Sequence, residues 1–219
     1  MSKQSHNDSQ HNNDSSSYEV EIRFCVANQA EAFALLPFLE ASLGAPKAWS
    51  TEIVGRTIYS AGKLLRVGRV PPTGESRYYL GYKGPDLGAF ANIRQELGEE
   101  ITHGITQSEI LTTLGLAATH TTTSAIVATL NEAGHRPFMA FAGVDRLGYY
   151  PPLALHTKLC QCAMILDDQL LVELELGANS LAAAQQAEAR LQSLAADYGL
   201  TDRLFREEPP TLLYQRTFG

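Results

Sequence analysis

The stretch YEVEIRF, residues 18–24, decides the interpretation of this chain. Its charged residues, Glu19, Glu21 and Arg23, alternate strictly with hydrophobic ones. Such alternation predicts a β-strand, here over residues 18–26, with one apolar face and one charged face. The stretch therefore raises the question of what a row of charges on one strand face is for.

A second stretch, LVELEL at residues 171–176, repeats the pattern with Glu173 and Glu175 on one face. Alternate residues of a strand lie about 6.6–7 Å apart on the same face, so two such pairs facing each other would gather four carboxylates. Four carboxylates are unfavourable together unless a cation lies among them, and their oxygens suit Mg²⁺, Mn²⁺ or Ca²⁺. A solvated outer face is the alternative interpretation of each pair, and the sequence alone leaves it open.

Basic residues follow the same rhythm on the strand-like stretches in between. They are Arg66, Arg77, Lys83, Arg94, Arg136, Arg146, His156 and Lys158. Taken singly, each is typical of a solvent-exposed cation. Together, charges of both signs on one face of many strands indicate a closed barrel with a polar interior, in which acids hold a metal and bases hold a polyanion.

The composition is that of a globular protein, with 219 residues of which 44% are hydrophobic and 19% charged. We expect a single domain over residues 18–219 and a disordered polar tail over residues 1–17. The net charge of −7 argues against a nucleic-acid partner. No apolar stretch is long enough for a membrane span or typical of a signal peptide, and three cysteines without a disulfide framework favour the cytoplasm.

Short strands separated by glycine- and proline-rich turns dominate the chain. Strands are expected at residues 51–59, 64–70, 78–83, 92–97, 138–146 and 153–166, and a last one within 167–176. Helices are expected at residues 28–43, 106–114, 121–133 and 180–198. Pro37 kinks or divides the first helix, and Asn179 or Ser180 caps the last. The predicted fold class is therefore α+β, mostly antiparallel β.

An ordered set of motifs resembles the CYTH superfamily, the triphosphate tunnel metalloenzymes. The family's E-x-E-x-K motif is similar to the stretch from Glu19 to Arg23. The motifs that follow in the family's order are Leu65-Arg66, the K-G-P turn of Lys83, Gly84 and Pro85, Arg94-Gln-Glu96, Arg146 before Tyr149, and Asp167 or Asp168 before Glu173 and Glu175. The resemblance covers residues 18–200, and the K-G-P turn is most similar to the class IV adenylate cyclase and thiamine triphosphatase group.

The resemblance implies an eight-stranded antiparallel barrel that forms a tunnel, with helices packed outside. It implies that Mg²⁺ or Mn²⁺ is bound by four carboxylates, namely Glu19, Glu21, Glu173 and Glu175. It also implies triphosphate contacts from Arg66, Lys83, Arg94 and Arg146, and an acidic wall residue at Glu96.

Three positions depart from the family pattern. Arg23 stands where the motif has lysine, and arginine keeps the charge but cannot exchange a proton as lysine does. Gly68 replaces the second arginine of an Arg-x-Arg pair, and Val144 replaces the lysine of a later Lys-x-Arg pair, for which Arg136 could compensate. We assign the catalytic roles to Glu19, Glu21 and Arg23, and a degenerate site is an open alternative.

The resemblance implies a metal-dependent enzyme that converts ATP to cyclic AMP and pyrophosphate, as class IV adenylate cyclases do. The first alternative is a triphosphatase of the same fold that acts on inorganic, thiamine or nucleoside triphosphate. The second alternative is a non-catalytic polyphosphate- or nucleotide-binding protein. The expected partner is a small triphosphate molecule, and the chain could form a homodimer.

Overall fold

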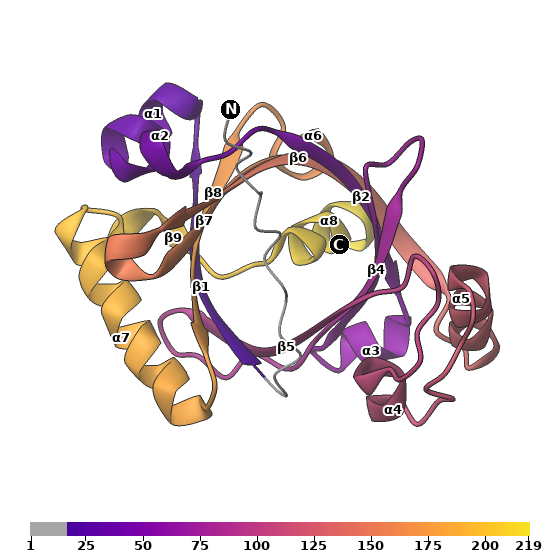
Figure 1. The fold of residues 1–219 in the computed structure, drawn as a ribbon. Coiled ribbons are helices and arrows are strands. Elements are labelled where there is room, and N and C mark those ends of the chain that lie inside the picture. Colours follow the sequence, from indigo (N-terminus) through magenta and orange to yellow (C-terminus); the bar gives the residue numbers. More distant parts are fainter. Residues whose placement is uncertain (1–16) are drawn as a thin grey trace, which may run out of the picture.

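Eight antiparallel strands close into a barrel in the computed structural model, which describes residues 17–219 (Figure 1). The strands are β1 (Ser17–Val26), β2 (Lys47–Val54), β3 (Leu64–Val70), β4 (Arg77–Lys83), β5 (Asn92–Glu100), β6 (Pro137–Tyr150), β7 (Leu155–Gln161) and β8 (Leu170–Ala178). Their order is β5-β4-β3-β2-β6-β7-β8-β1, and pairing of β1 with β5 closes the barrel. A short strand, β9 (Leu204–Phe205), lies beside β1. The predicted fold class is confirmed, whereas the expected disordered tail falls almost entirely on residues outside the described range.

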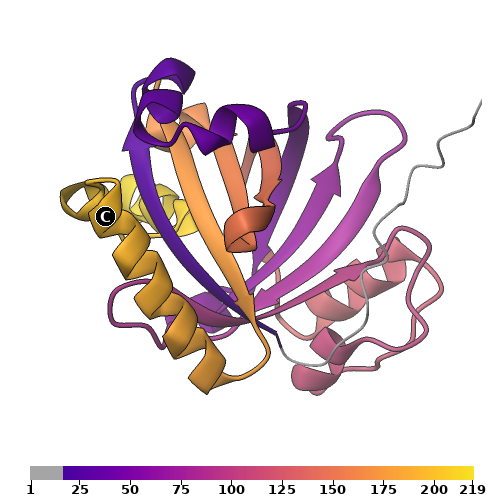
Figure 2. The ribbon, with the colours of Figure 1, turned by 60° about the vertical axis from the view of Figure 1, so that its left-hand side comes forward.

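Helices lie at several places around the barrel, as Figure 2 shows. They are α1 (Gln29–Leu35), α2 (Phe38–Ser42), α3 (Arg56–Ser60), α4 (Glu109–Thr113), α5 (Thr123–Glu132), α6 (Ala163–Leu166), α7 (Leu181–Asp197) and α8 (Pro209–Phe218). Pro37 divides α1 from α2, and the Ser180 side chain caps α7 by accepting from the amide of Ala183, both as predicted. Within residues 17–219, no helix combines the length and apolar character needed to cross a membrane.

Two predicted strands end earlier than expected, and the first of them, β2, also begins earlier, at Lys47. The strand expected at 51–59 ends at Val54, because Gly55 adopts a left-handed conformation (φ 73°) and α3 begins directly after it. The strand expected at 153–166 is β7, which ends at Gln161 before α6 begins. In contrast, β6 is longer than predicted and runs to Tyr150.

The helices on the outside cover the apolar faces of the strands. Leu191 and Leu194 of α7 pack with Val20 and Phe24 of β1 and Leu174 of β8. A separate cluster joins α4 and α5 to β3 and β4. The alternation in YEVEIRF is therefore resolved: its apolar residues face the helices, and its charges face the barrel interior.

The barrel interior is polar only in part. Inward residues of five strands, Ile53, Leu64, Phe141, Cys160 and Leu171, form an apolar cluster with Leu213 of α8. Figure 1, which looks along the barrel, shows α8 lying across it. Helix α8 was not predicted, and it gives the expected polar tunnel an apolar end.

Candidate active site

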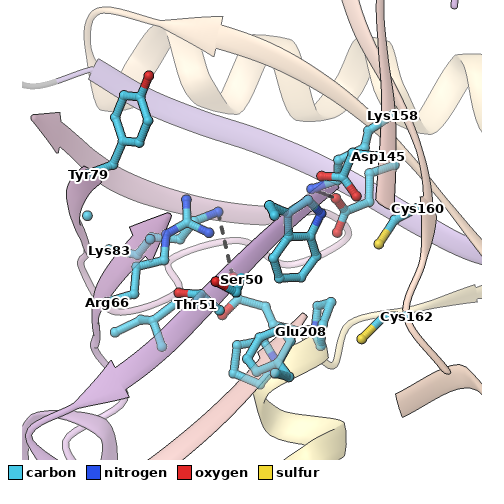
Figure 3. A pocket seen from close by; sticks show the side chains of 18 of the residues that line it. Ser50, Thr51, Arg66, Tyr79, Lys83, Asp145, Lys158, Cys160, Cys162 and Glu208 are labelled. Atoms are coloured by element: carbon cyan, nitrogen blue, oxygen red, sulfur yellow. Dashed lines mark ion pairs between the residues drawn. The ribbon is translucent and has the colours of Figure 1, made fainter. Parts of the chain in front are cut away.

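A cavity of about 370 Å³ occupies the barrel interior. Its wall includes residues from all eight barrel strands together with Glu208, Pro209 and Pro210 at the start of α8. Figure 3 shows Arg66 and Lys83 on one side of this cavity and Asp145 and Lys158 on the other. The cavity is therefore a charged chamber with one apolar end.

Lys83 is the centre of a buried group of charges. Its ammonium lies 2.6 Å from Glu19 Oε1, 3.8 Å from Glu96 Oε2 and 3.9 Å from Glu208 Oε1. Burial opposes the charge on Glu19, but Lys83 outweighs it and lowers the pKa of this carboxyl. Lys83 is thus part of the cavity wall and already has carboxylate partners, and its role as a phosphate contact stays a prediction.

Two arginines extend this group in different directions. Arg66 donates to Glu96 Oε1 at 3.2 Å, and its side chain remains 43% exposed, so it is accessible from the cavity. Gly81 makes room for it, since a Cβ there would lie 2.9 Å from Arg66 Nε. Arg94 Nε lies 3.5 Å from Glu208 Oε1, and Arg94 Nη1 donates to the carbonyl of Gly84 at 3.2 Å. Arg94 therefore supports Glu208 and does not itself form part of the cavity wall.

Arg23 is the centre of a second, more deeply buried group. Its side chain is 1% exposed, contacts the carboxylate of Glu21, and places Nε 3.4 Å from Glu173 Oε1. Arg23 also donates to the carbonyl of Arg206 at 2.9 Å. Lys158 of β7 contacts the other oxygen of Glu173. Arg23 thus ties β1 to β8 and to the segment that leads into α8.

Glu175 differs from the other three predicted metal ligands. Burial and the nearby carboxylates of Glu19 and Glu173 raise its pKa to about 7. Among residues 17–219, no base lies within ion-pair distance of Glu175. Its opposite residue in the β1–β8 pairing is another acid, Glu21. Glu175 is therefore only partly ionised at neutral pH.

The carboxylates as arranged do not fit a shared metal ion. Glu19 is paired with Lys83, Glu21 with Arg23, and Glu173 with both Arg23 and Lys158. In the described part of the chain, no three acidic, histidine or cysteine side chains are placed to share an ion. Carboxylate oxygens are the hard ligands that Mg²⁺ or Mn²⁺ prefers, but lysine and arginine side chains lie where such an ion would have to bind.

Three predicted phosphate contacts, Arg94, Arg136 and Arg146, are not part of the cavity wall. On β6 the inward positions are Asp145 and Leu147, so Arg146 points outward, where it donates to the carbonyl of Gly44 at 2.9 Å and to Gln29 Oε1 at 2.7 Å. Arg136 precedes β6, is exposed, and is not part of the wall that the described residues form. Arg136 therefore does not compensate for Val144.

The cavity residues that the sequence did not point out as site residues include Lys158, Glu208 and Trp49. Lys158 had a signal, because it shares a parity with His156 on a predicted strand, but it was not assigned a role. Glu208 had none, since it follows the last predicted helix and comes to the site only through α8. Trp49 lines the cavity, and its buried indole Nε1 has no hydrogen-bond partner among the described residues.

The two thiols of the cavity wall are held in their protonated form. Burial, reinforced by Asp145, raises the pKa of Cys160, and burial also raises the pKa of Cys162. A thiol acts as a nucleophile as the thiolate, and these shifts disfavour that form in both cysteines. The chemistry of the site belongs to its acids and bases.

No protein-family model matches the chain, and no curated protein does. Solved structures with similar folds include the PH1819 protein of Pyrococcus horikoshii OT3, with a TM-score of 0.68 and 15% identity over 90% of this chain and 99% of that one. A candidate adenylate cyclase of Vibrio parahaemolyticus has a TM-score of 0.62 and 16% identity over 90% of this chain and 97% of that one. The candidate adenylyl cyclase HpAC1 of Hippeastrum, described as having a dominant triphosphatase activity, has a TM-score of 0.50 and 14% identity over 84% and 88%. At these identities the likeness shows the fold alone.

Proposed function

We propose that this chain is an enzyme that acts on a triphosphate bound in the barrel cavity. The observation that carries the proposal is the convergence of Arg66, Lys83 and Lys158, from three separate strands, on one cavity. Guanidinium and ammonium groups placed around one volume are suited to a polyanion with several phosphate oxygens. The fold shared with a candidate adenylate cyclase and with HpAC1 supports this proposal.

The apolar part of the cavity favours a triphosphate that carries an organic group. Trp49, Ile53 and Phe141 lie in the same cavity wall as the charged side chains. Trp49 and Phe141 pack edge to face, with ring centroids 5.6 Å apart. A nucleoside or thiamine group would gain from this surface, whereas inorganic triphosphate would leave it without a contact.

The leading reaction is the cyclisation of ATP. The ribose 3′-hydroxyl gives its proton to water and attacks the α-phosphorus, the bond between that phosphorus and the oxygen bridging to the β-phosphate breaks, and pyrophosphate leaves. Arg66 and Lys83 would stabilise the charge that develops on the leaving pyrophosphate. Hydrolysis of the terminal phosphate by water is the alternative, and the triphosphatase activity of HpAC1 supports it. The Mg²⁺ or Mn²⁺ expected from the sequence, like the cytoplasmic location and the homodimer, stays a prediction.

A non-catalytic binder is the remaining alternative, and the pairing of bases with acids favours it. Lys83, Arg66 and Arg23 each have a carboxylate partner, so a triphosphate must replace protein carboxylates to be bound. Such a site can hold a polyanion without providing a group that takes up the proton of an attacking hydroxyl or water.

Product analysis separates these reactions. The purified chain is incubated with ATP, thiamine triphosphate or tripolyphosphate, each with Mg²⁺, with Mn²⁺ and with EDTA. Cyclic AMP with pyrophosphate indicates the cyclase, orthophosphate indicates the triphosphatase, and binding without turnover indicates the binder. Arg66→Met serves as the site variant, and Arg146→Met, on the outer face, is its matched control. Failure of all three compounds to bind would contradict the proposal.

A further inference from the structure

The ion pairs around Glu173 are set by strand register. Glu173 stands opposite Arg23 in the β1–β8 pairing and opposite Lys158 in the β7–β8 pairing. Residues directly opposite on neighbouring strands have their Cβ atoms about 4.5–5.5 Å apart, so the two cations flank the same carboxylate. The arrangement is therefore a property of the backbone as well as of side-chain rotamers.

The charge state of this trio is fixed by its members. Burial alone would raise the pKa of Glu173, but Lys158 and Arg23 outweigh it, so the pKa is lowered. Burial alone would lower the pKa of Lys158, but Glu173 and Asp145 raise it above the ordinary value. Each partner therefore favours the charged form of the other, and the Lys158 ammonium lies beside the acidic strand β8.

Lys158 also remains within reach of a ligand. Its side chain is 33% exposed and lies in the cavity wall, whereas Glu173 is 4% exposed and Arg23 is 1% exposed. An ammonium group has three N–H donors, so the contact with Glu173 leaves donors for a phosphate oxygen. Lys158 thus touches both the carboxylate and the space in which a phosphate would lie.

We infer that Lys158 is a built-in cation that takes the place of a divalent metal at Glu173, so that the cavity binds a triphosphate without one. The inference rests on the proposed function for its triphosphate part. For its metal part it rests only on the contacts of Glu19, Glu21 and Glu173 with protein bases. Lysine here both neutralises the acid, as a metal would, and contacts the phosphate.

The first test measures Mn²⁺ binding without any phosphate, by electron paramagnetic resonance of the free ion. Wild type, Lys158→Met and the matched surface control Lys63→Met are compared. Removal of Lys158 frees an oxygen of Glu173, so Lys158→Met is expected to bind Mn²⁺ at least about tenfold more tightly than the other two. Lys158→Arg keeps the cation and should resemble wild type. The inference would be overturned if wild type bound Mn²⁺ tightly and Lys158→Met bound it equally well or more weakly.

The second test measures tripolyphosphate binding by calorimetry in EDTA. Wild type and Lys63→Met should bind, whereas Lys158→Met should bind about tenfold more weakly and Lys158→Arg should recover most of the affinity. Binding by wild type that needs added metal would overturn the metal-free part. If tripolyphosphate binds under no condition, the proposed function fails, and the Mn²⁺ comparison still decides the role of Lys158. Circular dichroism shows that each variant is folded.

Discussion

Replacement of Arg23 by methionine tests whether the buried charges hold the barrel together. Arg23 is among the largest fully buried side chains of the described chain, and it contacts Glu21, Glu173 and the carbonyl of Arg206. Methionine fills similar space without the charge. The variant leaves Glu21 buried with no cation, while Glu173 keeps Lys158.

The expected loss of stability is large. Removal of one partner from a buried ion pair costs about 3–5 kcal/mol, because the other charge stays buried without compensation. That is a substantial part of the roughly 5–15 kcal/mol by which a domain is stable. Arg23→Lys keeps a cation but loses the fork that spans the two carboxylates and the carbonyl, so it should cost less, about 1–3 kcal/mol.

Denaturant unfolding measures the loss of stability in both variants. The signal is the fluorescence of Trp49, the single tryptophan of the chain, which lines the cavity. Arg136→Met is the matched control, because Arg136 is exposed, and it should change stability by less than about 0.5 kcal/mol. In the double variant with Glu21→Gln, removal of the stranded acid should restore about 1–3 kcal/mol. A cost below about 1 kcal/mol for Arg23→Met, or no recovery in the double variant, would refute the reasoning.

Three further predictions concern single side chains. Glu208→Gln should tighten tripolyphosphate binding about three- to tenfold, because it removes a carboxylate that competes for Lys83 and Arg94. The control variant Glu207→Gln changes an exposed neighbour and should leave the affinity unchanged. Equal affinities of the two variants in calorimetry would contradict this prediction. Arg146→Met should lower the stability by about 1–3 kcal/mol and leave tripolyphosphate binding unchanged. Arg66→Met should weaken tripolyphosphate binding about tenfold. Weaker binding by Arg146→Met with no change in Arg66→Met would show that Arg146 is part of the binding site. The pKa of Glu175 is raised from 4.5 to about 7, so the folded state holds this proton more tightly than the unfolded state, and stability is lost as pH rises from about 5 to 7. Thermal melts at several pH values should therefore show that Glu175→Gln becomes more stable relative to wild type as the pH rises through that range. Above it, the variant should be about 1–3 kcal/mol more stable than wild type. A stability difference that does not change with pH would contradict the assignment.

The barrel could be predicted because strand alternation is a local signal. In YEVEIRF and LVELEL every second residue is apolar, so a single register places all the charges of each stretch on one face. That face is the interior, where Glu21 and Glu173 line the cavity, whereas Glu19 and Glu175 are not part of its wall. The charged face of the first and last barrel strands could therefore be predicted from local sequence together with the pairing of those two strands.

The placement of Arg146 could not be predicted in the same way. Asp145 and Arg146 are adjacent charged residues, and both flanking positions, Val144 and Leu147, are apolar. The local pattern is therefore compatible with either residue facing inward. The choice is made by the pairing of β6 with β2 and β7, which turns Asp145 towards the cavity and leaves Val144 on the outside.

Helix α8 was missed because its position depends on contacts that are distant in the sequence. It begins with two prolines and has few buried residues, so its own pattern is weak. Leu213 is buried because it packs against the inward residues of the barrel strands, and Glu208 reaches Lys83 only when α8 is in place. A helix that closes a barrel is recognised by what it covers, and the sequence of the helix alone does not contain that information.

The interior of the barrel folds with its own counter-ions, and this has a consequence for ligand binding. Several like charges buried together would cost more than a domain's stability, so Lys83 with Glu19 and Arg23 with Glu21 compensate each other before any ligand arrives. A triphosphate that enters must replace those carboxylates at the bases it binds. Its affinity is therefore a difference between ion pairs formed and ion pairs lost, and side chains such as Glu208, which a phosphate can replace at Lys83, set that difference as much as the bases do.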